Sequence, residues 1–143
     1  MAFKNRLELR LSNSIAELQS VNSQLEQFGE IWNLSFELIF NLNLVLEEIL
    51  SNIIFYGYDD SAAHTIELNI GLEGEIIEIE IIDDAKPFNP LDRPDPDISQ
   101  SLESRKIGGL GIYLVKKIMD DANYFRKNDK NILILKKNIT TKS

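Results

Sequence analysis

One stretch of alternating isoleucines and charged residues constrains the fold of this chain more than any other feature. Residues 75–83 place three isoleucines on one face of an extended strand and two glutamates on the other, because neighbouring strand side chains point to opposite faces. Residues 3–11 and 65–71 read as strands of the same alternating kind. We therefore expect a sheet with one buried face.

Helical periodicity predicts what covers that face. Ser14 and Glu17 have the spacing of a capping box, and apolar residues then recur at helical intervals to about residue 29. Further helices are expected at about 35–56 and 109–121. Trp32 and Phe36 lie between the first two helices, where we expect them in the core, with a partner surface as the alternative.

The expected elements follow the order strand, helix, helix, strand, strand, loop, helix, strand, strand. The last two strands, 123–127 and 131–137, form a hairpin, as do the two strands before the loop. This order predicts an α+β two-layer sandwich, with a mixed, mostly antiparallel sheet covered on one face by helices. We expect one domain over residues 1–143, with a lid loop at about 84–108 and a polar tail at 138–143.

The composition excludes several classes of protein. Fifteen basic against 23 acidic residues give a net charge of −8, and the pairs Lys116-Lys117 and Lys136-Lys137 form no larger basic cluster. We therefore expect neither direct nucleic-acid binding nor attraction to anionic membranes. The chain has no cysteine, which excludes disulfides and thiolate sites. Its apolar runs are shorter than the ~20 residues of a membrane span, and its start lacks a signal-peptide core, so we expect a soluble, cytoplasmic protein.

Glu48 and Asn52 mark the first candidate site. They lie four residues apart on one face of the second expected helix, at the edge of its apolar stripe, whereas the adjacent Glu47 faces solvent. A carboxylate and an amide oxygen at this spacing can hold a hard cation and its waters, and the carboxylate can act as a general base. The alternative is that both are ordinary surface residues.

Asp83 marks the second candidate site, at the end of the isoleucine-rich strand. It is in phase with the buried isoleucines and should point into the core, whereas Asp84 should point outward. A buried carboxylate is costly unless donors reach it. The donor is either a protein group, such as a backbone amide or an arginine, or a ligand group, such as the exocyclic amino group of adenine.

A glycine-rich segment marks the third candidate site. Gly108, Gly109 and Gly111 directly precede a helix expected at 112–120. Without side chains a phosphate can approach closely, and a helix start offers free amides and the positive end of the helix dipole. The alternative is a glycine-rich turn without a ligand. Together the three sites fit one ligand that has a base, phosphates and a metal ion.

In this combination the chain resembles the ATP-binding domains of gyrase, heat-shock chaperones, histidine kinases and mismatch-repair proteins, which form the GHKL superfamily and share the Bergerat fold. Within it, the chain is most similar to the small bacterial anti-sigma factor serine/threonine kinases, over about residues 3–137. Residues 48–52 match the helical box of that family, residues 81–88 match the adenine box, and residues 108–115 match the box after the lid.

The resemblance implies roles for individual residues. Glu48 would act as the catalytic base, Asn52 would hold Mg²⁺, and Asp83 would accept a hydrogen bond from adenine. Backbone amides of the glycine-rich segment would hold phosphate oxygens, and Arg105 or Lys106 in the lid would neutralise charge on the transferred group. The expected nucleotide-binding set is Asn52, Asp83, Lys86, Arg105, Gly109, Leu110 and Gly111.

Three positions depart from the family pattern. Ala85 and Pro87 stand where the superfamily has glycines in the adenine box. Ala85 would be strained only at a positive φ, and Pro87 removes one amide donor. Asn131 stands where many relatives carry a hydroxyl residue, so a hydroxyl near the phosphates is expected to be missing.

The resemblance implies a serine/threonine kinase that uses ATP and Mg²⁺, phosphorylates a STAS-domain anti-anti-sigma protein, and can also bind a sigma factor or form a homodimer. One alternative is a catalytically silent interaction module of the same fold that regulates a partner by binding only. The departures favour that alternative, and the presence of both Glu48 and Asn52 opposes it. Another alternative is an ATPase coupled to a conformational change, which in gyrase relatives involves a transducer domain.

Overall fold

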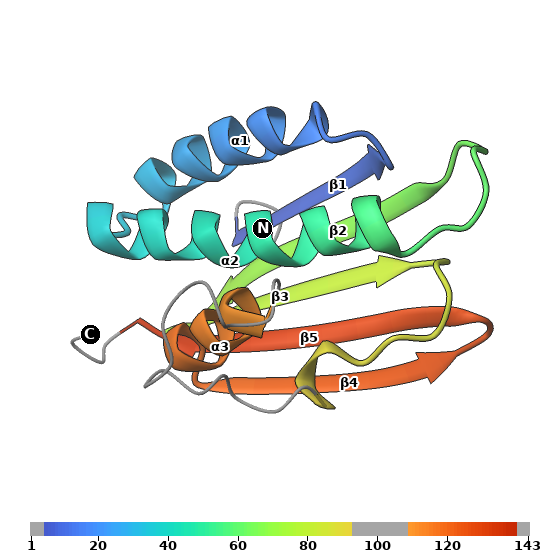
Figure 1. Ribbon diagram of the computed structural model, residues 1–143. Coiled ribbons are helices and arrows are strands. Elements are labelled where there is room, and N and C mark those ends of the chain that lie inside the picture. Colours follow the sequence, from blue (N-terminus) through green and yellow to red (C-terminus); the bar gives the residue numbers. More distant parts are fainter. Residues whose placement is uncertain (1–4, 93–108, 140–143) are drawn as a thin grey trace.

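A five-stranded sheet carries three helices on one of its faces (Figure 1). The computed structural model describes residues 5–92 and 109–139. The strands are β1 (Arg6–Ser12), β2 (Thr65–Glu73), β3 (Ile76–Asp83), β4 (Asp121–Lys127) and β5 (Lys130–Asn138). The helices are α1 (Glu17–Ile31), α2 (Phe36–Tyr56) and α3 (Gly109–Ile118), with a short 3₁₀ helix at Pro90–Asp92. This arrangement confirms the predicted α+β two-layer sandwich.

The strand order is β1-β2-β3-β5-β4, and every pair of neighbours is antiparallel. The prediction of a mixed sheet was therefore wrong for the described strands. The connection from β3 through α3 joins β3 to β4, which run in the same direction. Because β5 lies between these two strands, they form no parallel pair.

The buried face of the sheet follows the isoleucine alternation. Ile77, Ile79 and Ile81 of β3 are at most 1% exposed. Ile79 faces Ile70 of β2 on one side and Leu135 of β5 on the other, and both partners are fully buried. Each such side chain contributes about 1.5–3 kcal/mol when it is removed from water. The sheet therefore holds β3 firmly at its centre, with Asp83 at the strand's end.

The two long helices begin in different ways. Ser35 caps α2, because its hydroxyl accepts a hydrogen bond from the Leu38 amide at 3.1 Å. The capping box predicted for α1 was wrong, since α1 begins only at Glu17. The Glu17 carboxylate instead accepts from the backbone amide of Ser12 at 2.7 Å, which ties the helix start to the end of β1. A turn between Ser14 and Glu17 precedes the helix.

Both predicted hairpins are present. The β4–β5 turn has Asn128 and Asp129 at φ of 53° and 61°, a conformation that these two residue types tolerate better than most. The β2–β3 turn contains Gly74 at φ 61°, where a side chain would be strained. The β4–β5 turn sets the register that brings β5 alongside the end of β3.

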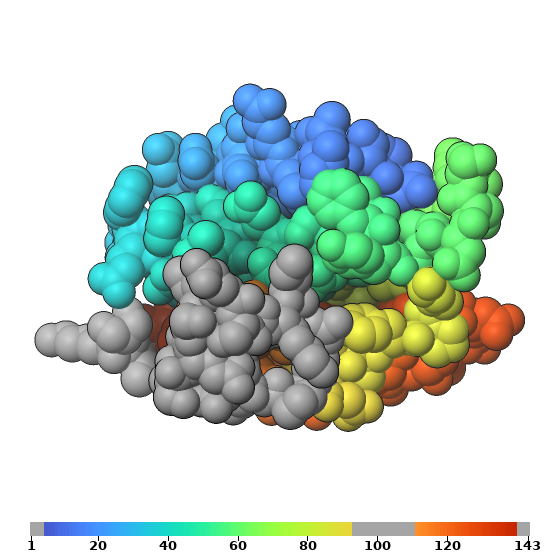
Figure 2. All heavy atoms as spheres, in the orientation of Figure 1, coloured from blue at the N-terminus to red at the C-terminus, as the bar shows by residue number. Residues whose placement is uncertain are grey.

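Helix α2 is more apolar than its place in the core requires. It is long and apolar enough to cross a membrane by length and composition alone, contrary to the expectation from short apolar runs, although the core helix of a globular protein passes the same test. Its inner face, with Leu42, Leu46 and Leu50, is fully buried. Trp32 is buried as expected, but Phe36 is 87% exposed, so placing Phe36 in the core was wrong. Figure 2 shows the molecule from the side of the helical layer.

Candidate functional site

A pocket of about 460 Å³ opens between the C-terminal half of α2 and the ends of β3 and β5. Most of its lining is apolar, and the segment from Ala85 to Pro90 forms one wall. Its polar lining side chains include Asn52, Asp83 and Asn131, which come from three separate elements. A mostly apolar pocket with a few convergent polar groups is the usual form of a small-molecule site.

Asp83 lies at the base of this site and is only 5% exposed, as the strand alternation predicted. Its Oδ1 accepts hydrogen bonds from the Ala85 amide at 3.0 Å and from the Asn131 side-chain amide at 2.8 Å. Within residues 5–92 and 109–139, no donor reaches Oδ2. One oxygen thus fixes the orientation of the carboxyl group, and the other remains able to accept a hydrogen bond from a ligand.

The surroundings of Asp83 disfavour the ionised form of its carboxyl group. Burial raises the pKa of its carboxyl above the usual value, and the neighbouring charge of Asp84 adds to the rise. The hydrogen bonds from Asn131 and Ala85 and the positive charge of Arg126 offset part of this rise in pKa. The ionised form of Asp83 therefore depends on these donors.

Asn131 connects Asp83 to the rest of the pocket wall. Its side-chain nitrogen donates to Asp83 and also to the Lys86 carbonyl at 3.0 Å. Its side-chain oxygen accepts from the Arg126 guanidinium at 3.0 Å and from the Tyr124 hydroxyl. The pocket residue that sequence reasoning treated only as a missing hydroxyl is a buried hydrogen-bonding centre.

A sequence signal for Asn131 did exist. The β3–β5 register pairs Asp83 with Asn131, and Asn131 is in phase with the buried residues Leu133 and Leu135 of β5. The same alternation that pointed Asp83 inward therefore also points Asn131 inward. Finding the contact required the strand order, because the two residues are 48 positions apart in the chain.

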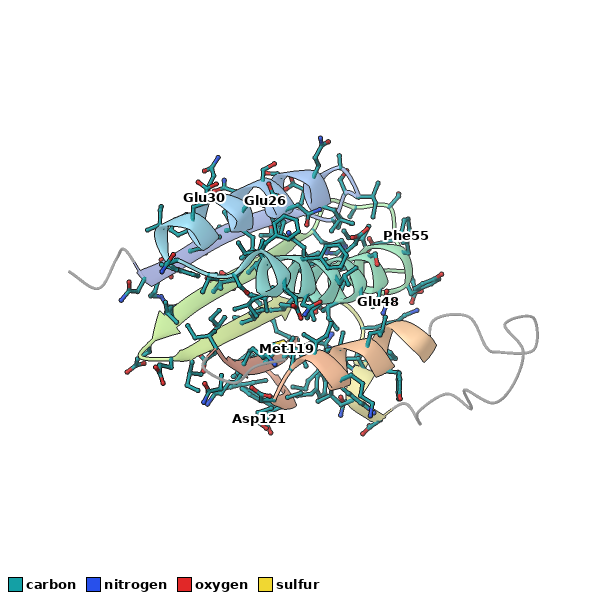
Figure 3. The ribbon with its side chains drawn as sticks, turned by 90° about the vertical axis from the view of Figure 1, so that its left-hand side faces the viewer. Glu26, Glu30, Glu48, Phe55, Met119 and Asp121 are labelled. Atoms are coloured by element: carbon teal, nitrogen blue, oxygen red, sulfur yellow. The ribbon has the colours of Figure 1, made fainter. Side chains whose placement is uncertain are left out.

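Glu48 and Asn52 lie one helical turn apart on α2, but they have different surroundings. Asn52 lines the pocket, whereas Glu48 does not. Glu48 instead packs against Gly111 of α3, so closely that a Cβ added to Gly111 would overlap the Glu48 carboxyl. Figure 3 shows Glu48 on the side of α2 that faces α3. A side chain at position 111 would therefore displace the Glu48 carboxyl from this position.

The glycine-rich segment agrees with one of its two expected helix boundaries. Gly109 and Gly111 lie inside the first turn of α3, which begins at residue 109 as expected, and not before a helix that begins at residue 112. The amides of a first turn have no intrahelical acceptor, and they lie at the positive end of the helix dipole. The predicted binding residue Arg105 and the glycine Gly108 lie outside the described residues, as does the side chain of Leu110.

Lys86 lines the pocket, but its charged end is engaged elsewhere. Its ammonium group pairs with the Asp59 carboxylate at 2.9 Å, and its backbone amide donates to the Gly57 carbonyl at 3.1 Å. The ion pair is exposed, and such pairs contribute only about 0–1 kcal/mol. Lys86 can therefore exchange this partner for an anionic ligand at little cost.

A second polar cluster adjoins the pocket, and the sequence did not predict it. His64 has Nε2 2.8 Å from Asp60 Oδ1 and Nδ1 3.1 Å from Asp84 Oδ2, and its ring stacks on Tyr58. Hydrogen bonds with Asp60 and Asp84 raise the pKa of His64. The cluster fastens the segment after α2 to the end of β3, next to Asp83.

The described residues include no group of three or more histidine, cysteine, aspartate or glutamate side chains that could hold a metal ion. Mg²⁺ commonly takes one or two protein ligands and completes its octahedron with waters and phosphate oxygens. Asn52 offers an amide oxygen at the pocket wall, and Glu48 lies one turn away. These residues fit a Mg²⁺ ion that arrives with a polyphosphate.

The chain belongs to the histidine kinase-like ATPase domain family, whose profile matches residues 11–137. Among individual relatives, it is 27% identical over 101 residues to serine/threonine-protein kinase BtrW of Bordetella bronchiseptica, covering 71% of each chain. It is 27% identical over 93 residues to serine-protein kinase RsbW of Oceanobacillus iheyensis, covering 62% of this chain and 58% of that one. The family resemblance is thereby confirmed.

Solved structures share the fold at lower identity. The structure of the RsbU and RsbW domains of Rv1364c from Mycobacterium tuberculosis matches 94% of this chain, with a TM-score of 0.67 and 15% identity. This chain covers 32% of that longer chain. The histidine kinase domain of the Erythrobacter litoralis blue-light activated kinase EL346 matches 88% of this chain, with a TM-score of 0.55 and 16% identity. Both confirm the histidine-kinase-like fold.

Proposed function

We propose that this protein binds ATP with Mg²⁺ and transfers the γ-phosphoryl group to a serine or threonine of a partner protein. The observation that carries the proposal is the inward carboxyl of Asp83 in a largely apolar pocket, where no donor from the described residues reaches Oδ2. An acceptor in this setting suits the exocyclic amino group of adenine, and the apolar walls suit its ring.

The order of groups along α2 supports one direction for the bound nucleotide. The pocket and Asp83 lie by the C-terminal half of the helix, and Asn52, Glu48 and the first turn of α3 follow in sequence away from it. Adenine at Asp83 would extend its phosphates past Asn52 toward the amides of Gly109 and Gly111. Asn52 would hold Mg²⁺, which supplies neutralisation of phosphate charge.

Glu48 is the proposed general base, and its place beside the first turn of α3 supports this role. Its carboxylate would take the proton of the attacking serine or threonine hydroxyl, while the hydroxyl oxygen forms a bond to the γ-phosphorus and the bond from that phosphorus to the β–γ bridging oxygen breaks. The products are a phosphorylated partner and ADP. A positioned general base accounts for about 10²- to 10⁴-fold of such a rate, and positioning and charge stabilisation account for most of the remainder.

The partner class rests on the family. Relatives with the names serine-protein kinase RsbW and serine/threonine-protein kinase BtrW support a protein substrate. The sequence resemblance to anti-sigma factor kinases narrows the proposed substrate to a STAS-domain anti-anti-sigma protein, with a sigma factor as a second partner.

A silent binding module is the second candidate, and one observation bears on it directly. Of the three non-glycine residues that adopt a positive φ in the described ranges, none is Ala85, so replacing glycine there creates no backbone strain. Ala85 also donates its amide to Asp83. These contacts favour a working pocket over a degenerate one.

Two measurements test the proposal together. Calorimetric titration with ATP and with GTP, with and without Mg²⁺, should show binding that prefers ATP and gains affinity with Mg²⁺. Incubation with γ-labelled ATP and purified STAS-domain proteins should then label one of them. Binding without any transfer would favour the silent module, and the absence of ATP binding would refute both the pocket assignment and the kinase.

A further inference from the structure

Arg126, Asn131 and Asp83 form a row across three neighbouring strands. The register pairs Arg126 of β4 with Asn131 of β5, and it pairs Asn131 with Asp83 of β3. Figure 1 shows these strands side by side, with β5 between the other two. Residues directly opposite each other on one face of a sheet lie close enough for their side chains to interact. A cation, an amide and an anion therefore follow one another across the sheet, at the end that carries the pocket.

The guanidinium of Arg126 binds three acceptors from separate segments. Nη1 carries two hydrogens, and it donates to the Ala85 carbonyl at 2.9 Å and to the Asn131 side-chain oxygen at 3.0 Å. Nη2 donates to the Asp129 carbonyl in the β4–β5 turn at 3.2 Å. Arg126 thus ties together the turn, strand β5 and the wall of the pocket, although it is exposed and does not itself line the pocket.

The contact with Arg126 bears on which way the Asn131 amide points. A guanidinium can only donate hydrogen bonds, so the side of the amide that faces it must be the carbonyl oxygen. The Tyr124 hydroxyl binds the same oxygen, but a hydroxyl can donate or accept and would tolerate either orientation. The amide nitrogen then faces Asp83 and donates to its Oδ1 at 2.8 Å. With the amide reversed, two oxygens would face each other at a buried carboxylate, which is costly.

The same two side chains fasten the wall of the pocket. Asn131 donates to the Lys86 carbonyl at 3.0 Å and accepts from the Phe88 amide at 3.4 Å, and Arg126 donates to the Ala85 carbonyl. These backbone contacts favour the same orientation of the Asn131 amide. Arg126 adds the charged donor, and hydrogen bonds from charged donors are stronger than those from neutral ones.

The acidic side of the site opposes the ionised form of Asp83. Burial raises the pKa of Asp83, and the charge of the adjacent Asp84 adds to the rise. Tyr58, in the segment after α2, brings no counter-charge, because burial and the carboxylates of Asp83 and Asp84 raise the pKa of its hydroxyl. His64 binds Asp84 rather than Asp83, and Asn52 of α2 is neutral.

Arg126 supplies a compensating positive charge. Lys86 also lines the pocket, but its ammonium group pairs with Asp59 at 2.9 Å. The hydrogen bond from Asn131 lowers the pKa of Asp83, and the charge of Arg126 lowers it further. Both effects act along the same row, because Arg126 binds the amide that donates to Asp83. Removal of Arg126 would therefore weaken two of the groups that favour the carboxylate.

We propose that Arg126 is a positioning residue of the pocket, which secures the Asn131 amide with its nitrogen toward Asp83 and so keeps the Asp83 carboxylate ready to accept a hydrogen bond from a ligand. Arg126 acts through Asn131 and the Ala85 carbonyl. The effect on Asp83 belongs to the free protein, whereas the effect on ATP rests on the proposed function.

Titration of the Asp83 carboxyl tests the proposal without any nucleotide. The full chain is isotope-labelled for NMR, and the carboxyl resonance of Asp83 is assigned by its loss in Asp83→Asn and followed against pH. Arg126→Met keeps a long side chain but removes its donors and charge, so the pKa of Asp83 should be higher in this variant than in the parent. Arg126→Lys, which restores a charge and a donor, should return that pKa most of the way to the parental value.

Lys127→Met is the matched control, because it removes an exposed positive charge from the next position of β4. It should leave the Asp83 titration unchanged. An unchanged Asp83 pKa in Arg126→Met, or an equal rise in Lys127→Met, would overturn the proposal. A purely structural role for Arg126 would lower the melting temperature of Arg126→Met and leave the Asp83 titration as it is in the parent.

Circular dichroism melts report whether each variant folds. If Arg126→Met does not fold, Arg126→Gln takes its place, because glutamine keeps a donor but not the charge. Arg126→Gln should raise the pKa of Asp83 by a smaller amount. A parental Asp83 pKa in that variant would contradict the proposal.

A second readout connects the row to the nucleotide. At about pH 7, Arg126→Met should raise the dissociation constant for ATP roughly two- to tenfold, the effect of losing one ordinary hydrogen bond. The difference from the parent should narrow as pH rises, because Asp83 is then ionised in both proteins. Parental ATP affinity of Arg126→Met at every pH would show that the row does not prepare Asp83 for its ligand. A parent that binds no ATP would refute the proposed function, while the Asp83 titration would still decide the role of Arg126.

Discussion

The two ends of the candidate site are built in different ways. At the Asp83 end, Asn131, Ala85, Arg126 and Tyr124 form a connected set of hydrogen bonds among buried or half-buried groups. At the Glu48 end, the carboxylate is placed by close packing against Gly111. Recognition of a base needs a fixed acceptor, whereas a general base must meet a substrate that arrives from outside. The first end is thus preorganised, and under the proposed function the second would be completed by its ligands.

The largest effect is expected from Glu48→Gln, at the end built by packing. Removal of the proton acceptor should slow phosphoryl transfer by about 10²- to 10⁴-fold, while ATP binding changes little because the adenine end is intact. Transfer is measured with γ-labelled ATP and a STAS-domain substrate, and binding by calorimetry. The exposed neighbour Glu47→Gln is the matched control and should behave like the parent. Parental transfer by Glu48→Gln would remove the carboxylate from the chemistry.

The next effect concerns Asp83→Asn, at the hydrogen-bonded end. A hydrogen bond to a charged group contributes about 1.5–3 kcal/mol, so the dissociation constant for ATP should rise roughly 10- to 100-fold. Calorimetric titration measures it. Asp121→Asn, an exposed aspartate of β4, should leave the dissociation constant unchanged. If Asp83→Asn binds ATP as tightly as the parent, Asp83 does not contact the nucleotide.

Asn131→Ala is expected to weaken ATP binding less than Asp83→Asn does, and to change the pH dependence of that binding. Burial already raises the pKa of Asp83, and loss of the Asn131 donor should raise it further. A protonated Asp83 is a poor acceptor, so ATP binding should weaken as pH falls through this raised pKa, and it should do so at a higher pH in the variant. The dissociation constant is measured at successive pH values from neutral into the acid range.

The control for this pH profile is Asn123→Ala, which removes an exposed asparagine from the same hairpin. It should show the parental profile. An identical profile in Asn131→Ala and the parent would mean that Asn131 does not hold Asp83 in its ionised form.

The smallest effect is expected from His64→Gln, in the cluster of His64, Asp60 and Asp84 next to the pocket, and it concerns the melting temperature. The pKa of His64 is raised in the fold by its hydrogen bonds with Asp60 and Asp84. The contribution of His64 to the stability of the folded protein should be fully present below its unfolded pKa of about 6.5. That contribution should be lost as pH rises through the pKa of His64 in the folded protein. The difference in melting temperature between the parent and His64→Gln should therefore shrink with rising pH. A difference that stays constant from acid to alkaline pH would contradict this role.

The sequence best predicted the features that follow from the spacing of apolar residues within a single strand or helix. The strand alternation correctly placed Asp83 inward, and helical spacing correctly placed Glu48 and Asn52 one turn apart. The start of α1 was wrong because Glu17 bonds to Ser12 of β1, a contact between two elements. The mixed sheet was wrong because β5 inserts between β3 and β4, which no local pattern reveals.

The contacts that complete the candidate site are non-local, and for that reason the sequence did not show them. Asn131 reaches Asp83 only through the β3–β5 pairing, and Gly111 meets Glu48 only through the packing of α3 on α2. The exposure of Phe36 was also unexpected, because helical periodicity does not report which apolar side of a nearly all-apolar helix faces the sheet.

The insertion of β5 between β3 and β4 has a consequence for biogenesis. A ribosome delivers Glu48 and Asp83 well before residue 131, so a nascent chain carries the acid groups of the site without the strand that secures one of them. Asp83 gains its amide neighbour only when the C-terminal hairpin pairs, through β5, with the edge of β3. Nucleotide capture would then report that the whole chain has been made and has folded in the correct register.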